Sequence, residues 1–163
     1  MPDVREFFGN KQNNTIHNKT NVRNETIYQK DLKFGLSNED IQQIALEKHF
    51  NCKFQQTDRY SFVDYINSEK KIIIELKSRR CGRYTYNTTI IGYDKVEYCL
   101  KKIEEGYDIY FFFYFEKDKT LCKYQFTKEN HNPNWIRFTG RMNRGKDERK
   151  NYYDVPTKDL IQI

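Results

Sequence analysis

The sequence predicts a single α/β or α+β domain, in which a mixed β-sheet is flanked by helices. Apolar residues recur at helical spacing within residues 37–51 and 93–105, and runs rich in β-branched and aromatic residues alternate with these segments. Residues 109–115 form a wholly apolar run bounded by charges, which is typical of a buried central strand. With 163 residues, the chain is long enough to bury one sizeable core.

The N-terminal segment differs in composition from the rest of the chain. Residues 9–30 are dominated by Asn, Lys and Thr and lack a sustained apolar period. Such a segment buries too little apolar surface to order itself. We therefore expect residues 1–30 to be a flexible arm and residues 31–163 to form one domain.

Two helices are predicted. The first is expected to begin at Ser37, which forms a capping-box pattern with Asp40, and to end near Phe50. The second covers residues 93–105, and Gly106 follows it as a natural helix end.

The predicted strands lie around these helices. Residues 60–66 and 71–77 are expected to pair as a β-hairpin through a turn at residues 67–70, whereas residues 79–92 are expected to be a loop or an irregular strand. The remaining strands are predicted at residues 109–115, 121–126 and 135–138, before a basic loop at residues 140–150 and a last element at residues 152–163.

Charge and composition narrow the classes of function. The net charge of +6 and the pI near 9.0 favour an anionic partner such as nucleic acid. The four cysteines have no metal-ligand spacing and are expected to be reduced thiols, there is no secretory signal, and no apolar run is long enough to span a bilayer. We therefore expect an intracellular protein without membrane association. The phosphate-binding loop pattern of nucleotide hydrolases is absent, as are serine-hydrolase and zinc-protease motifs.

The hairpin is predicted to bring two acids and a lysine to one face. Side chains alternate along a strand, so Glu75 and Lys77 share a face. A turn closed symmetrically about Ser68 and Glu69 would place Asp64 opposite Ile73, and therefore on that same face. A register slip of one residue would move Asp64 to the other side.

Acids gathered in this way call for a compensating charge. A divalent cation with oxygen ligands relieves their repulsion, polarises a bound phosphate and lowers the pKa of a bound water, while Lys77 orients that water or offsets developing charge. The alternative is that Glu75 and Lys77 are ordinary exposed residues, because Glu-x-Lys is a common strand pattern. The preceding isoleucine run, residues 72–74, favours a buried strand instead.

These residues resemble the PD-(D/E)XK nuclease superfamily. Asp64 matches the first acid of its signature, and Glu75-Leu76-Lys77 matches the (D/E)XK part; Val63 replaces the proline. The resemblance covers residues 35–126 and implies a restriction-endonuclease-like core. It also implies that Asp64, Glu75 and the Leu76 carbonyl bind Mg²⁺ or Mn²⁺, and that Lys77 positions the attacking water.

Other roles follow from the same resemblance. Many members carry a further acid on the first core helix, for which Glu39 is the candidate and Glu47 the fallback; a glutamate in a first helical turn is also favoured by the helix dipole alone. The residues after the motif resemble those of virus- and phage-encoded members, in which Arg79, Tyr84 and Lys95 would face the substrate. The Asn-, Lys-, Ile- and Tyr-rich composition suits an AT-rich viral genome, which would place the protein in the host cytoplasm or nucleus.

Two basic groups are candidates for nucleic-acid contacts. Arg80 and Arg83 lie close to the predicted site, and a second group near the C-terminus is flanked by aromatic residues. Such segments can neutralise phosphates and stack on bases, although a solvated basic loop is the alternative. The C-terminal group consists of Arg137, Arg141, Arg144, Lys146, Arg149 and Lys150.

The expected function is metal-dependent hydrolysis of DNA phosphodiester bonds by an endonuclease. A non-catalytic DNA-binding module on a nuclease-like fold and an RNA-cleaving enzyme using the same site remain open alternatives, as does an interaction protein that uses its aromatic surface. A concerted cut of both strands would need two sites, for which a C2 homodimer is the commonest arrangement.

Overall fold

Two β-sheets, two α-helices and two short 3₁₀-helices, η1 (Pro133–Trp135) and η2 (Thr157–Asp159), form the regular structure of the part of the chain that the structure, a computed structural model, describes: residues 25–142 and 147–163. The six-stranded sheet has the order β1-β2-β3-β5-β6-β9 and mixes parallel and antiparallel pairs, and the three-stranded sheet has the order β4-β8-β7. The strands are β1 (Gln55–Gln56), β2 (Tyr65–Asn67), β3 (Ile72–Arg79), β4 (Thr88–Gly92), β5 (Asp108–Phe115), β6 (Thr120–Phe126), β7 (Ile136–Thr139), β8 (Lys150–Pro156) and β9 (Ile161–Gln162). The mixed α/β class is confirmed.

The parallel pair β3 and β5 forms the centre of the larger sheet. The pairing joins Ile72 to Asp108 and continues without a break to Arg79 and Phe115. The chain between the two strands contains β4 and α2 (Tyr93–Glu104), because parallel neighbours need a long crossover. The apolar run of β5 is buried on both faces, as its sequence predicts.

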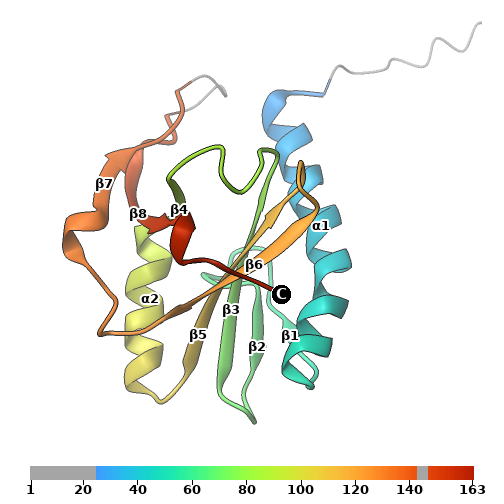
Figure 1. The fold of residues 1–163 in the computed structure, drawn as a ribbon, viewed down its shortest axis with the longest axis vertical. Helices are drawn as coiled ribbons and strands as arrows, with labels where there is room; N and C mark the ends of the chain where they lie inside the picture. The colour runs from blue at the N-terminus through green and yellow to red at the C-terminus, as the bar shows by residue number, and fades with distance from the viewer. Residues whose placement is uncertain (1–24, 143–146) are drawn as a thin grey trace, which may run out of the picture.

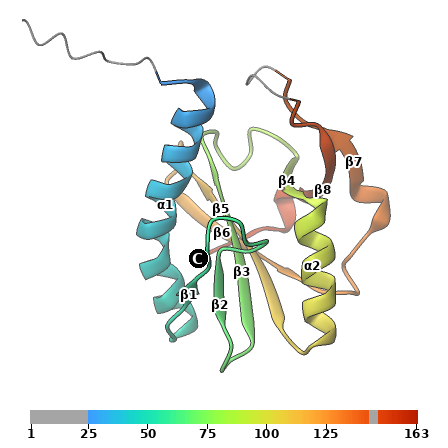
Figure 2. The same ribbon diagram turned by 180° about the vertical axis from the view of Figure 1, so that it is seen from behind.

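The two helices cover opposite faces of this sheet (Figures 1 and 2). On one face Leu46 of α1 (Ile27–Phe50) packs with Ile74 and Phe112. On the other face Val96 of α2 packs with Phe113. Every second side chain of β3 therefore points toward α1, and the intervening ones, including Glu75, share the α2 face. Within the described residues, neither helix has the length and apolar character required to cross a bilayer.

The start of α1 was predicted wrongly. The helix begins at Ile27, with Thr26 and Gln29 forming the capping box, and Ser37 lies inside it with its hydroxyl donating to the Lys33 carbonyl. Gly35, which precedes the predicted start at Ser37, also lies inside the helix. The predicted end near Phe50 is confirmed. Of the predicted arm, residues 1–24 lie outside the described residues, whereas residues 27–30 form the first turn of α1.

The hairpin is shorter and shifted relative to the prediction. Only Tyr65–Asn67 is a strand, and Asn67 pairs with Ile72 rather than with Lys70, across a turn in which Lys71 has φ +52°. If this register is continued by one residue, Asp64 lies opposite Glu75 instead of opposite Ile73. The shift is two residues, so the side on which Asp64 falls relative to β3 is unchanged.

Most of the remaining predictions agree with the structure to within a few residues, but the single last element predicted at residues 152–163 is divided between β8 in the smaller sheet and β9 in the larger one. α2 starts at Tyr93 as expected, and Gly106 adopts φ +87° just beyond its end. Part of the segment expected to be irregular is the strand β4, which pairs with β8 in the second sheet. The basic loop at residues 140–150 is described at both ends but not at residues 143–146.

Candidate active site

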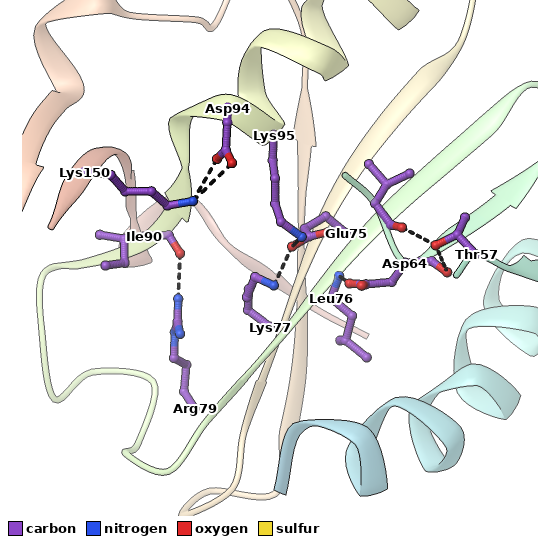
Figure 3. A network of polar contacts seen from close by, with 11 residues as sticks. Thr57, Asp64, Glu75, Leu76, Lys77, Arg79, Ile90, Asp94, Lys95 and Lys150 are labelled. Atoms are coloured by element: carbon purple, nitrogen blue, oxygen red, sulfur yellow. Dashed lines mark hydrogen bonds and ion pairs between the residues drawn. The ribbon is translucent and has the colours of Figure 1, made fainter. Parts of the chain in front are cut away.

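A buried carboxylate with two lysine partners lies at the centre of β3. Glu75 has no exposed surface, and its Oε1 lies 2.5 Å from Lys77 Nζ and 2.6 Å from Lys95 Nζ (Figure 3). Lys77 follows Glu75 on the same face of the strand, and Lys95 reaches it from the first turn of α2. A carboxylate in an apolar interior is costly unless it is paired, and the two ammonium groups supply that pairing.

The other oxygen of this carboxylate forms no hydrogen bond with either lysine. Glu75 Oε2 is buried and has no hydrogen-bond partner among the described residues. Buried polar atoms in native proteins are nearly always paired with protein, water or an ion. The free oxygen is therefore a ligand position that the chain itself does not use.

Asp64 reaches the edge of β3 beside Glu75. Its backbone N–H donates to the Ile74 carbonyl at 3.0 Å, and its Oδ2 accepts the Leu76 N–H at 2.7 Å (Figure 3). The carboxylate thus replaces the main-chain partner that β2 would otherwise offer Leu76. Burial, followed by repulsion from Glu75, raises the pKa of Asp64 to about 7, although Lys77 and Lys95 oppose the shift.

The backbone that carries Asp64 is held by Thr57. Thr57 N–H donates to the Asp64 carbonyl at 2.9 Å, and the Thr57 hydroxyl lies within hydrogen-bonding reach of the carbonyls of Val63 and Asp64. Residues 60–64 are not a regular strand, so these contacts take the place of ladder pairing in fixing the acid.

Glu39 joins the cluster from α1, and Glu47 does not. Burial raises the pKa of Glu39, Glu75 adds to that shift, and Lys77 and Lys95 oppose it, which places the Glu39 carboxyl within the field of the same charges. The hydroxyl of buried Tyr65 donates to the Glu39 carbonyl at 2.7 Å and ties this turn of α1 to β2. Glu47 instead accepts from Lys53 Nζ at 2.7 Å and from the Phe54 N–H, away from the site.

The predicted metal ligands fit a hard divalent cation. Asp64 and Glu75 present oxygens that repel each other, and Glu75 Oε2 has no partner. The N–H and C=O of one strand residue point to the same side of the strand, so the Leu76 carbonyl faces the edge where Asp64 lies. The described residues contain no group of three His, Cys, Asp or Glu side chains arranged to hold a metal, so two carboxylates and a carbonyl would be the protein's share. Mg²⁺ commonly keeps several waters in such sites.

The predicted nucleic-acid contacts fall into two groups. Lys95 belongs to the site itself, because its ammonium pairs with Glu75. Arg79 links β3 to β4. Its guanidinium donates to Thr89 Oγ1 at 3.0 Å. It also donates to the Ile90 carbonyl at 2.6 Å (Figure 3). Both side chains are thus held by the protein before any substrate arrives.

Three of the other predicted contacts, Arg80, Arg83 and Arg141, line a cleft near the C-terminal end of β3. Arg80 and Arg141 both pair with Asp31, and Tyr84 is exposed beneath the guanidinium of Arg83, which lies 4.9 Å from the ring centre. Arg144 and Lys146 lie outside the described residues. The cleft has a volume of about 480 Å³ and is lined in part by Arg79, Arg80, Arg83, Arg137 and Arg141.

Sequence reasoning missed two positioning features of the site. The pairing of Lys95 with Glu75 depends on how α2 returns across the sheet, and no local pattern signals it. Thr57 was overlooked because its role arises from an irregular segment that was predicted to be a strand. In the structure both residues contact the acids themselves or the backbone that carries them.

Comparisons with protein-family models, with curated proteins and with solved structures found no match to this chain. What the chain does has to be inferred from the chemistry of its own side chains.

Proposed function

We propose that this chain is a divalent-metal-dependent nuclease that hydrolyses DNA phosphodiester bonds on a restriction-endonuclease-like core of the PD-(D/E)XK kind. The observation that carries the proposal is the convergence of Asp64, Glu75 and Lys77 at one edge of β3, where one Glu75 oxygen has no partner within residues 25–142 and 147–163. The arrangement of a helix, a hairpin, a crossover helix and a further central strand supports the same reading.

Each residue has a separate role in this proposal. Asp64, Glu75 and the Leu76 carbonyl would hold Mg²⁺ or Mn²⁺, and the ion would supply polarisation of the phosphate and activation of water. Burial lowers the pKa of Lys77, but the charges of Glu75 and Asp64 outweigh it and raise the pKa above its usual range. Lys77 therefore stays protonated at neutral pH and acts as a hydrogen-bond donor to the attacking water or to the phosphate, not as a base.

Glu39 and Lys95 tune this centre from the two helices. Glu39 adds a third acid whose pKa is raised by burial and by Glu75 and is lowered by Lys77 and Lys95, and it would help to place water at the site. Lys95 offsets the charge of Glu75, so the buried carboxylate stays compatible with folding before a metal binds.

A digestion panel tests the proposal. Plasmid, linear, single-stranded and branched DNA, with RNA alongside, are incubated with the purified chain in Mg²⁺, in Mn²⁺ and in EDTA. We expect cleavage of DNA only with a divalent ion, and its loss in Asp64→Asn but not in the neighbouring surface variant Asp40→Asn. Asp40 is exposed on α1, so it controls for the loss of one acidic charge.

The same panel separates the alternatives. Binding of DNA without cleavage in any metal would favour a non-catalytic DNA-binding module. Cleavage of RNA but not DNA would assign the same site to an RNA-processing enzyme. If the chain neither cleaves nucleic acid nor binds it in a salt-dependent way, the proposal is wrong.

A further inference from the structure

The cleft beside the site gathers positive charge from distant parts of the chain. Arg79, Arg80 and Arg83 come from the end of β3 and the loop after it, whereas Arg137 and Arg141 come from β7 and the segment that follows. The loop after β3 arches across the upper part of the molecule between α1 and β4 (Figures 1 and 2). None of the described residues that line this cleft is acidic, so its walls favour an anion.

The guanidinium groups are positioned before any ligand binds. Arg137 makes two 2.9 Å contacts with Asp154, and Arg80 and Arg141 share the single carboxylate of Asp31 at 3.0 and 3.6 Å. The two remaining arginines use uncharged acceptors, such as the Ile90 carbonyl for Arg79 and the Leu160 carbonyl for Arg83. Positive charge therefore exceeds negative charge around the cleft, and planar guanidinium groups suit phosphate oxygens.

The cleft leads toward the proposed active site. Arg79 continues the alternation of Glu75 and Lys77 on one face of β3. A second cleft of about 410 Å³, between β3 and the N-terminal half of α1, is lined by Lys77 together with Arg79, Arg80 and Arg141. The three arginines border both clefts, so a polyanion held by them passes next to Lys77.

Two exposed tyrosines accompany the arginines. Tyr86 lines the arginine cleft and is 65% exposed, and Tyr84 in the same loop is 74% exposed. Rings exposed to this degree add little to the core, and they offer flat faces next to phosphate-binding groups. Base faces are buried in a duplex but free in an unpaired strand, where stacking on aromatic rings contributes strongly to binding.

We propose that the arginine cleft and the tyrosines of its rim receive an unpaired nucleic-acid strand, with guanidinium groups on the phosphates and Tyr86 and Tyr84 stacked on the bases. This rests on the proposed function and narrows it: the nuclease acts on substrates with a single-stranded segment, such as an overhang, a flap or a branch, and duplex DNA without such a segment binds less well.

Fluorescence anisotropy in EDTA tests this inference without cleavage. The probes are a labelled oligo-dT and a labelled blunt-ended duplex with the same number of phosphates. We expect tighter binding of the oligo-dT, a roughly 5- to 150-fold loss in Tyr86→Ala, and near wild-type binding in Tyr86→Phe, which keeps the ring. Tyr86 is exposed, so an unchanged melting temperature will show that the variants fold.

The arginines are tested through salt dependence. Arg80→Gln and Arg141→Gln should each reduce the slope of log affinity against log salt for oligo-dT by about 0.7. Lys101→Gln, an exposed charge near the far end of α2, serves as the control and should leave the slope unchanged.

Equal or tighter binding of the blunt-ended duplex, or full affinity in Tyr86→Ala, would overturn the inference. Because no metal is present, this result is distinct from failure of the proposed function. A chain that prefers the oligo-dT but never cleaves would keep the strand-binding cleft and lose the nuclease. A chain that cleaves DNA but binds both probes equally would support the nuclease and contradict the strand-binding cleft.

Discussion

The Nζ atom of Lys95 lies 2.6 Å from Glu75 Oε1, the same oxygen that Lys77 approaches. A lysine from the first turn of α2 thus helps to neutralise a fully buried acid on β3. The pair links the crossover helix to the strand that carries the motif. Glu75 Oε2 has no hydrogen-bond partner among the described residues, and in the proposed function it is the oxygen that would face a metal.

Removing Lys95 should weaken the fold through Glu75. Lys95→Met should lower the free energy of unfolding by roughly 1–3 kcal/mol, less than for a singly paired buried acid because Lys77 still pairs with it. Urea denaturation measures the change, and Lys101→Met on the exposed side of α2 is the control. Equal unfolding midpoints for Lys95→Met and the wild type would show that the contact contributes nothing.

The two glutamates of α1 should behave in opposite ways. Glu39→Gln should reduce cleavage at least about tenfold with little change in stability, because Glu39 lies among the charges of the site. Glu47→Gln should leave the cleavage rate unchanged and lower the melting temperature, because Glu47 accepts from Lys53 and Phe54. Single-turnover cleavage and thermal unfolding of both variants test this pair, and interchanged effects would contradict the assignment.

Thr57 should affect the cleavage rate only by fixing the position of Asp64. Thr57→Val keeps the size of the side chain but removes the hydroxyl contacts to the carbonyls of Val63 and Asp64. Loss of these contacts should lower the free energy of unfolding by about 1 kcal/mol. We expect slower cleavage with nearly unchanged DNA binding, and recovery in Thr57→Ser, which keeps the hydroxyl. Slow cleavage in the serine variant as well would locate the effect elsewhere than in this hydrogen bond.

Stability without metal should fall as pH rises toward neutral. The pKa of Asp64 is raised from its ordinary value of 3.8 to about 7 by burial and by Glu75, so between these values the folded protein binds more protons than the unfolded chain. Its contribution to stability is complete below the unfolded pKa and is lost as pH rises through the folded pKa. Urea midpoints in EDTA at about pH 5 and about pH 8 measure the loss. Asp64→Asn should show a smaller change between the two, and an identical change would assign the titration to another group.

Local sequence patterns were sufficient to predict a helix or strand that could be recognised without knowing its neighbours in the fold. The apolar run of β5 and the start of α2 at Tyr93 follow from composition and period, and both are confirmed. The hairpin turn was predicted two residues out of register, yet the expected placement of Asp64 beside Glu75 survived, because strand faces repeat every two residues.

Features set by tertiary contacts could not be predicted in this way. The early start of α1 is not such a feature, because the capping box of Thr26 and Gln29 that begins the helix is a local pattern and was overlooked. The partnership of Lys95 with Glu75 and the meeting of Arg79 with Arg137 at one cleft depend on chain segments far apart in sequence.

The most direct test is the Mg²⁺-dependent cleavage rate of Glu75→Gln and Lys77→Met under single-turnover conditions, with DNA affinity measured in parallel. Both variants should lose roughly a hundred- to a thousandfold in rate or more, while affinity for DNA in EDTA stays near that of the wild type. Cleavage at the wild-type rate in both folded variants would contradict the assignment of this cluster as the catalytic centre.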